Sequence, residues 1–124
     1  MKNDWIYDIE TYKNVFTIAL EHAQSGVRCA WEVSEWVNES SQIIRMMDYL
    51  KATGGRMVGF NNLGFDYPVL HLLYRMRTAD AATLYAKAQA IIASQELNRF
   101  QHQVYPSDRV VEQIDLFKIH HFDN

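Results

Sequence analysis

Three carboxylates of this chain stand in two short motifs whose spacing could build a metal site. The first motif, Asp8-Ile9-Glu10-Thr11, follows the apolar run Trp5-Ile6-Tyr7. Residues two apart in a strand project from the same face, so Asp8 and Glu10 would point the same way. Neighbouring carboxylates repel each other unless a cation or several donors compensate, and oxygen ligands suit Mg²⁺ or Mn²⁺ better than zinc. The alternative is that the strand ends at Tyr7 and leaves both acids solvated in a loop.

The third carboxylate, Asp66, lies in a second motif that runs from Gly59 to Pro68. Proline is well suited to the first turn of a helix, where its missing N–H costs nothing. Asp66 is therefore predicted at or near the N-cap of a helix that starts at about residue 67. A capping role would by itself explain Asp66, so this motif also has a purely structural interpretation.

Taken together, the two motifs resemble those of the DEDD (DnaQ-like) exonucleases, a branch of the ribonuclease H-like fold. The first is similar to the D-x-E-T of that family. Residues 61–66, Asn-Asn-Leu-Gly-Phe-Asp, are similar to its N-x-x-x-F-D, in the form used by phage-type and family B DNA polymerase proofreading domains. The resemblance implies hydrolysis of the terminal phosphodiester at a nucleic acid 3′ end by two ions, Mg²⁺ or Mn²⁺. It makes Asp8, Glu10 and Asp66 the catalytic metal ligands, with Asp8 bridging both ions.

The same resemblance suggests how the substrate would be held. It implies that Thr11 and Asn61 touch the terminal nucleotide or its phosphate, and that Phe60 and Phe65 stack or wedge against bases. Packing in the core is the alternative role for the two phenylalanines. DNA is favoured over RNA as the nucleic acid partner.

The chain departs from the family at its third motif, which should add a fourth carboxylate and a general base from a C-terminal helix. Neither Y-x-x-x-D nor H-x-x-x-x-D occurs after Asp66, because Tyr105 lies too close to Asp108 and His102 too far from it. We therefore expect a fold that is incomplete at its C-terminal end: an N-terminal fragment, a truncated product or a naturally short relative. Asp115 is a candidate substitute acid.

A further cluster of potential metal ligands, His120, His121 and Asp123, lies near the end of the chain. Adjacent residues of a strand face opposite ways, which argues against both histidines binding one ion.

Apolar periodicity, β-forming residues and glycines predict an α/β fold in a single domain, residues 1–124. Strands are expected at about 3–9, 14–21, 27–33, 56–60 and 112–117, helices at 41–52, 67–77 and 80–93, and an irregular loop at 94–111. The first three strands would form an antiparallel meander, and the fourth would run parallel to the first. This is the ribonuclease H-like mixed sheet flanked by helices that the resemblance implies. Ligand sites of open α/β sheets favour the carboxyl ends of parallel strands, where the acids would meet.

Composition limits the classes of protein that fit. The net charge of −3 argues against a protein that coats nucleic acid through bulk basic charge. The single cysteine, Cys29, excludes an intrachain disulfide. No apolar run is long enough for a membrane span and the N-terminus has no apolar signal region, so a cytoplasmic setting is expected.

Three hypotheses follow. The chain is a metal-dependent 3′–5′ exonuclease or proofreading domain, associated with a polymerase domain. Alternatively, it is a catalytically inactive module that binds nucleic acid or inhibits another protein. In the third hypothesis, a partner chain or a second copy in a homodimer completes the fold.

Overall fold

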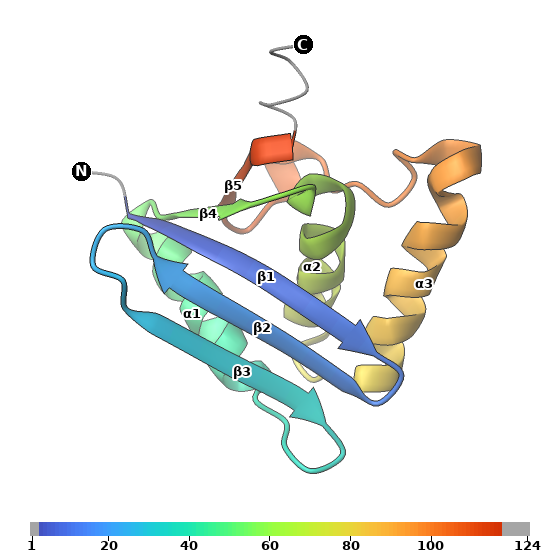
Figure 1. Cartoon of the computed structure of the whole chain (residues 1–124), viewed down its shortest axis with the longest axis horizontal. Coiled ribbons are helices and arrows are strands. Elements are labelled where there is room, and N and C mark those ends of the chain that lie inside the picture. Colours follow the sequence, from blue (N-terminus) through green and yellow to red (C-terminus); the bar gives the residue numbers. More distant parts are fainter. Residues whose placement is uncertain (1–2, 118–124) are drawn as a thin grey trace.

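The structure is an α/β arrangement in which helices pack on a mixed sheet (Figure 1). The computed structural model describes residues 3–117, and His120, His121 and Asp123 therefore lie outside the described residues. The strands are β1 (Asp4–Tyr12), β2 (Val15–His22), β3 (Arg28–Ser34), β4 (Arg56–Gly59) and β5 (Glu112–Asp115). The α-helices are α1 (Ser40–Thr53), α2 (Tyr67–Met76) and α3 (Ala81–Asn98). A π-helical turn, η1 (Asn62–Asp66), precedes α2, and a 3-10 turn, η2 (Pro106–Asp108), precedes β5.

The five strands form one sheet in the order β3-β2-β1-β4-β5. β2 pairs antiparallel with both β1 and β3, which confirms the predicted meander. β4 runs parallel to β1 after the crossover through α1, also as predicted, and β5 adds in parallel to the far side of β4. The carboxyl ends of β1, β4 and β5 therefore lie toward the same edge of the sheet.

One face of the sheet carries the hydrophobic core. Tyr7 and Ile9 of β1 alternate inward, and α1 covers this face with Ile43, Met47 and Leu50. α1 contacts β3, while α3 contacts β1 and β2. In Figure 1 the meander lies in front of α1, and the viewed face of β1, β2 and β3 carries no helix of the described chain.

Two helix boundaries follow from local sequence. The Asp80 carboxylate accepts a hydrogen bond from the Thr83 N–H at 2.7 Å, which confirms Asp80 as the N-cap of α3. Gly54 ends α1 in the left-handed conformation, with a φ of 68°, where glycine has no Cβ penalty. No helix in the described part of the chain has the length and apolar character needed to cross a membrane.

Three predicted boundaries were wrong. β1 continues to Tyr12 instead of ending at about residue 9, because it stays paired with β2 as far as the Tyr12–Val15 pair. α3 extends through residues predicted as a loop, since Gln95, Glu96 and Leu97 favour helix even though their side chains are exposed. β5 ends at Asp115 rather than at residue 117.

Candidate active site

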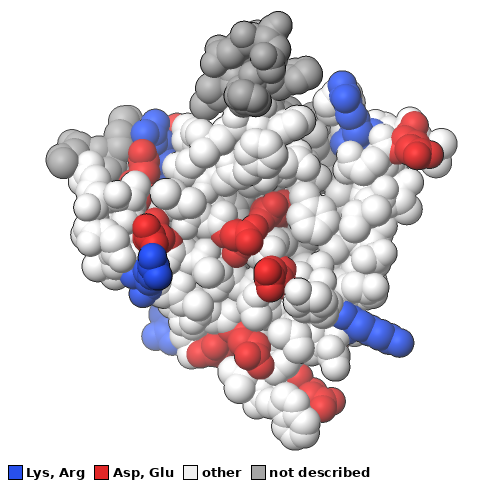
Figure 2. Space-filling view, in the orientation of Figure 1, with Lys and Arg blue, Asp and Glu red and all other residues white. Residues whose placement is uncertain are grey.

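Asp8 and Glu10 lie on the open face of β1. Both side chains are exposed, while Ile9 between them is buried, as the alternation predicted. Asp8 is paired across the strands with Ala19, and Glu10 with Thr17. Figure 2 shows acidic side chains in the middle of this face, whereas lysines and arginines lie toward its rim. The first motif thus presents two carboxylates to solvent from a rigid strand.

Asp66 reaches the same strand from a different element. The residue is 8% exposed, and its Oδ2 accepts a hydrogen bond from the backbone N–H of Ile9 at 3.1 Å. The pairing of β1 with β4 ends at Ile6 and Val58. Beyond that point the Asp66 carboxylate, instead of a β4 carbonyl, accepts the backbone N–H of Ile9. Asp66 is the N-cap residue of α2, as predicted, but its side chain makes no cap hydrogen bond and its backbone is already helical, so capping does not explain this carboxylate. The fold therefore joins the two sequence motifs through one direct contact.

The π-helical turn η1 sets the position of Asp66. It begins after Asn61, whose φ of 57° is in the left-handed region. Gly59 permits the chain to close tightly, since a Cβ there would lie 2.9 Å from the Cβ of Asn62. π-Helical turns are rare and often occur at functional sites.

Asp115 holds this turn from the neighbouring strand. Its Oδ1 accepts the N–H groups of Asn61 (2.8 Å) and Phe117 (3.0 Å), and its Oδ2 accepts the N–H of Leu63 at 3.2 Å. Asp115 is 5% exposed and on the core side of β5, in register with Gly59. Its oxygens are thus occupied by backbone donors, and the candidate substitute acid acts in this structure as a brace for the turn.

A buried polar network supports the same region. Gln113 Oε1 accepts hydrogen bonds from the Tyr7 hydroxyl at 2.7 Å and from Asn62 Nδ2 at 2.9 Å. Gln113 Nε2 in turn donates to the Val111 carbonyl. Sequence reasoning missed Gln113 and Tyr7 as site-supporting residues. A weak signal was available, since tyrosine and glutamine inside strands need polar partners once buried.

The electrostatics of Asp66 follow from this setting. Burial raises the pKa of its carboxyl from 3.8 to about 6, and the charges of Asp8 and Asp115 add to the rise, while the hydrogen bond from Ile9 opposes it. An ionised Asp66 is thus unfavourable beside Asp8 unless a cation compensates for the charge, and without one the folded chain favours the protonated form.

The donor set fits a hard cation in chemistry but only partly in geometry. Within residues 3–117, no three His, Cys, Asp or Glu side chains are grouped closely enough to hold a metal ion by themselves. Mg²⁺ is usually bound by one or two carboxylates, with water and substrate phosphate oxygens completing its six ligands. Asp8 and Asp66 are the two carboxylates nearest to this description, since the charge of Asp8 acts on Asp66, and Glu10 is next along the open face of β1.

The four predicted substrate-binding residues have different surroundings. Asn61 directly precedes the turn that ends at Asp66, and it is exposed. Phe60 is 63% exposed and packs edge-on against Phe117, with ring centroids 5.2 Å apart. Phe65 is partly buried against the core, and Thr11 alternates to the face of β1 opposite Asp8 and Glu10. The structure thus brings Asn61 and Phe60 to the edge that carries the acids.

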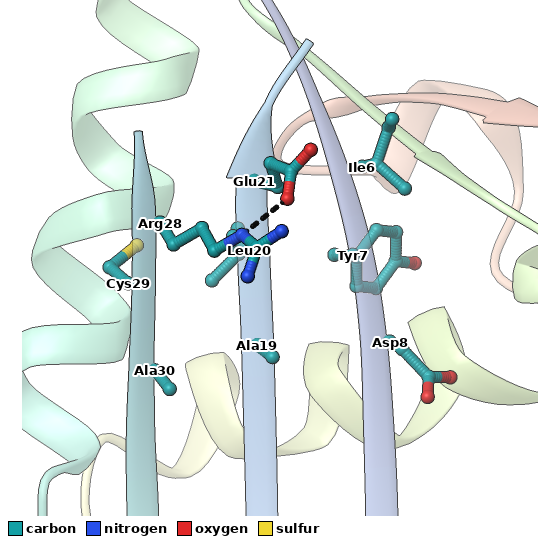
Figure 3. A pocket seen from close by; sticks show the side chains of 9 residues that line it. All are labelled: Ile6, Tyr7, Asp8, Ala19, Leu20, Glu21, Arg28, Cys29 and Ala30. Carbon is teal, nitrogen blue, oxygen red and sulfur yellow. Dashed lines mark hydrogen bonds and ion pairs between the residues drawn. The ribbon is translucent and has the colours of Figure 1, made fainter. Parts of the chain in front are cut away.

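A hollow of about 530 Å³ lies next to Asp8 on the open face (Figure 3). It exists because Ala19 and Ala30, paired across β2 and β3, are small. The ion pair between Arg28 and Glu21, 2.6 Å long, borders its other end. The hollow therefore leaves open space beside the first motif.

Comparison of this chain with models of protein families, with curated proteins and with solved structures found no match.

Proposed function

We propose that this chain is a metal-dependent nuclease of the DEDD type that acts on nucleic acid 3′ ends. The observation that carries the proposal is the hydrogen bond between Asp66 and the Ile9 N–H, at 3.1 Å. Ile9 lies between Asp8 and Glu10, so this contact unites the acids of both motifs at one sheet edge. A chance pair of short motifs has no reason to converge in this way.

The sheet supports the proposal as well. An antiparallel meander followed by a parallel strand is what a ribonuclease H-like fold requires, and the order β3-β2-β1-β4-β5 agrees with it. The acids stand near the carboxyl ends of the parallel strands, where open α/β sheets favour ligand sites. We propose DNA as the substrate class, in line with the resemblance to proofreading domains.

Each acid would have a distinct task. Asp8, Glu10 and Asp66 would hold Mg²⁺ or Mn²⁺, which when bound supplies an activated water and charge stabilisation for the leaving 3′ oxygen. Because Asp66 Oδ2 accepts the Ile9 N–H, the backbone of β1 holds the carboxylate in place, and its Oδ1 would be the atom that carries a proton or contacts a cation. The backbone contact thereby positions the carboxylate before any ligand arrives.

A second candidate function is a catalytically inactive binding module on the same fold. It is favoured by the lack of a complete three-ligand group in the described part of the chain. Such a module would bind DNA or a protein without hydrolysis.

Nuclease activity can be tested with a 5′-labelled single-stranded oligonucleotide in Mn²⁺, followed on a sequencing gel. We expect the parent chain to produce a ladder of stepwise shortened products. Asp8→Asn and Asp66→Asn should each lower the rate by about a hundredfold or more, because each removes a charge from the centre that binds the metal. Asp48→Asn on α1 is the matched control and should retain the parent rate.

Two outcomes would decide against this proposal. If the parent yields no products under conditions where it is folded and binds the oligonucleotide, the binding module replaces the nuclease. If products form but persist in Asp8→Asn and Asp66→Asn, the activity comes from a contaminant or from another site.

A further inference from the structure

A second pocket lies at the far end of α3, in a segment that shares no residue with the acid site. Its volume is about 350 Å³, within the range of small-molecule sites. The residues that line it are Phe100, Gln101, Gln103, Val104, Tyr105, Pro106 and Arg109. This lining contains two aromatic rings, two amides and a guanidinium, and it contains no carboxylate.

Arg109 is the most unusual member of this lining. Its Nε is buried and has no hydrogen-bond partner among residues 3–117. Neither of the ion pairs found in that range involves Arg109. A buried donor on a charged group costs free energy when it has no acceptor, so this geometry favours an anion at Arg109. The carboxylate nearest in sequence, Asp108, is exposed and lies outside the pocket lining.

The walls of the pocket are fixed to the rest of the fold. Lys87 of α3 lies 3.0 Å from His102, and Val104 packs against the hydrophobic core. The Val110 N–H donates to the Tyr67 hydroxyl at 2.7 Å, which ties the segment after Arg109 to the first turn of α2. Burial raises the pKa of Tyr67, and the Val110 hydrogen bond and the Arg109 charge oppose this rise. The pocket is thus formed before a ligand binds.

The aromatic side chains point to the other half of the ligand. Tyr105 and Phe100 remain 75% and 58% exposed. Arg99 stacks on the Phe100 ring, 5.0 Å from its centroid, and adds a second cation at the rim. Exposed rings bind planar bases by stacking, and the Gln101 and Gln103 amides offer both donors and acceptors to base edges.

We propose that this pocket binds a nucleotide-class ligand, an aromatic ring joined to a phosphate, with the phosphate on Arg109 and the ring against Phe100 and Tyr105. The ligand class follows from the lining and does not depend on the nuclease proposal. The site is separate from Asp8 and Asp66, which belong to other elements.

Isothermal titration calorimetry of the full chain in EDTA, with thymidine 5′-monophosphate as the probe, tests this site. EDTA removes divalent cations, so binding through the acid site is suppressed. We expect saturable binding, and we expect thymidine alone and inorganic phosphate alone to bind at least about tenfold more weakly, since each lacks one of the two recognised groups. Arg109→Gln should weaken binding by about tenfold or more, whereas Arg45→Gln on α1 should leave it unchanged.

Two further variants keep the test decisive. Asp66→Asn should retain full affinity, and its loss there would move the ligand to the acid site and overturn the proposal. If Arg109→Gln does not fold, Arg109→Lys should still weaken binding, because lysine lacks the planar fork of donors. Absence of binding at millimolar nucleotide, or equal affinity in the parent and both Arg109 variants, would also overturn it.

Discussion

The carboxylate of Asp66 accepts the backbone N–H of Ile9 at 3.1 Å, so a side chain from the turn before α2 continues the edge of β1 where β4 has ended. This contact fixes Asp66 next to Asp8, whose charge raises the pKa of the Asp66 carboxyl further than burial alone. The arrangement costs folding free energy whenever Asp66 is ionised without a compensating cation.

Asp66→Asn should therefore stabilise the fold at alkaline pH. The pKa of Asp66 rises from 3.8 to about 6 on folding, so the folded chain binds the proton more tightly and loses stability as pH increases through that interval. The amide keeps an oxygen that can accept the Ile9 N–H. The substitution should therefore raise the free energy of unfolding by on the order of 2–3 kcal/mol at pH 8. Urea unfolding at pH 8 and below pH 4 checks this, since the gain should vanish at the lower pH. An equal gain at both pH values would contradict the ionisation of Asp66 as its cause.

Divalent cations should reverse the same penalty. If Asp8 and Asp66 bind Mg²⁺ or Mn²⁺, the ion binds the folded chain only and therefore stabilises it. Each kcal/mol that ion binding adds to the free energy of unfolding should raise the Tm by roughly 3–5 °C. Thermal melts of the parent in EDTA and in millimolar Mn²⁺ measure the shift. Asp66→Asn should show a much smaller shift, while Asp48→Asn should behave like the parent. A shift of the same size in Asp66→Asn would show that the ion binds elsewhere.

Asp115→Asn should loosen the turn that carries Asp66. The carboxylate accepts three backbone N–H groups, and an amide would set a donor against one of them inside the protein. We expect a loss of about 2–3 kcal/mol in the free energy of unfolding. Relief of the repulsion between Asp115 and Asp66 is a smaller effect, because Asp115 is the weakest of the influences on the pKa of Asp66.

The amide hydrogen exchange of Asn61 and Leu63 gives a local measurement of the same change. Both amides should exchange faster in Asp115→Asn than in the parent, relative to amides of the meander. Unchanged protection at these two positions would show that the turn holds its shape without the carboxylate.

Two glycines of the second motif should differ in their tolerance of alanine. A Cβ at Gly59 would meet Asn62, which is fully buried and held by Gln113, so Gly59→Ala should cost about 2–3 kcal/mol. At Gly64 the nearest atom is the Oδ1 of Asn61, 2.6 Å away, at the end of an exposed side chain that can rotate. Gly64→Ala should therefore cost less than about 1 kcal/mol, and denaturant unfolding of the two variants side by side measures the contrast. Equal losses would mean that Asn61 is as fixed as Asn62.

Much of the architecture follows from local sequence. Strand alternation predicted that Asp8 and Glu10 share the face opposite Ile9, because period-two geometry is a property of the backbone itself. The meander, the parallel fourth strand and the Asp80 cap follow from turn residues, segment lengths and capping chemistry. The boundaries of α3 were less accurate, since a polar helix end and a polar loop have similar compositions.

Which buried residues hold the acid site in place became clear only from the tertiary structure. In β5 the polar residues Gln113 and Asp115 face the core, while Ile114 between them is only half-buried, which reverses the usual order of a half-exposed strand. Their partners, Tyr7 and the turn around Asn61 and Asn62, lie far away in the sequence. The sequence by itself determined which acids could form a site, because side-chain type and strand period are local. The fold decided that Asp66 binds Ile9 and that Asp115 braces the turn, because a buried hydrogen bond depends on elements that meet only when the sheet assembles.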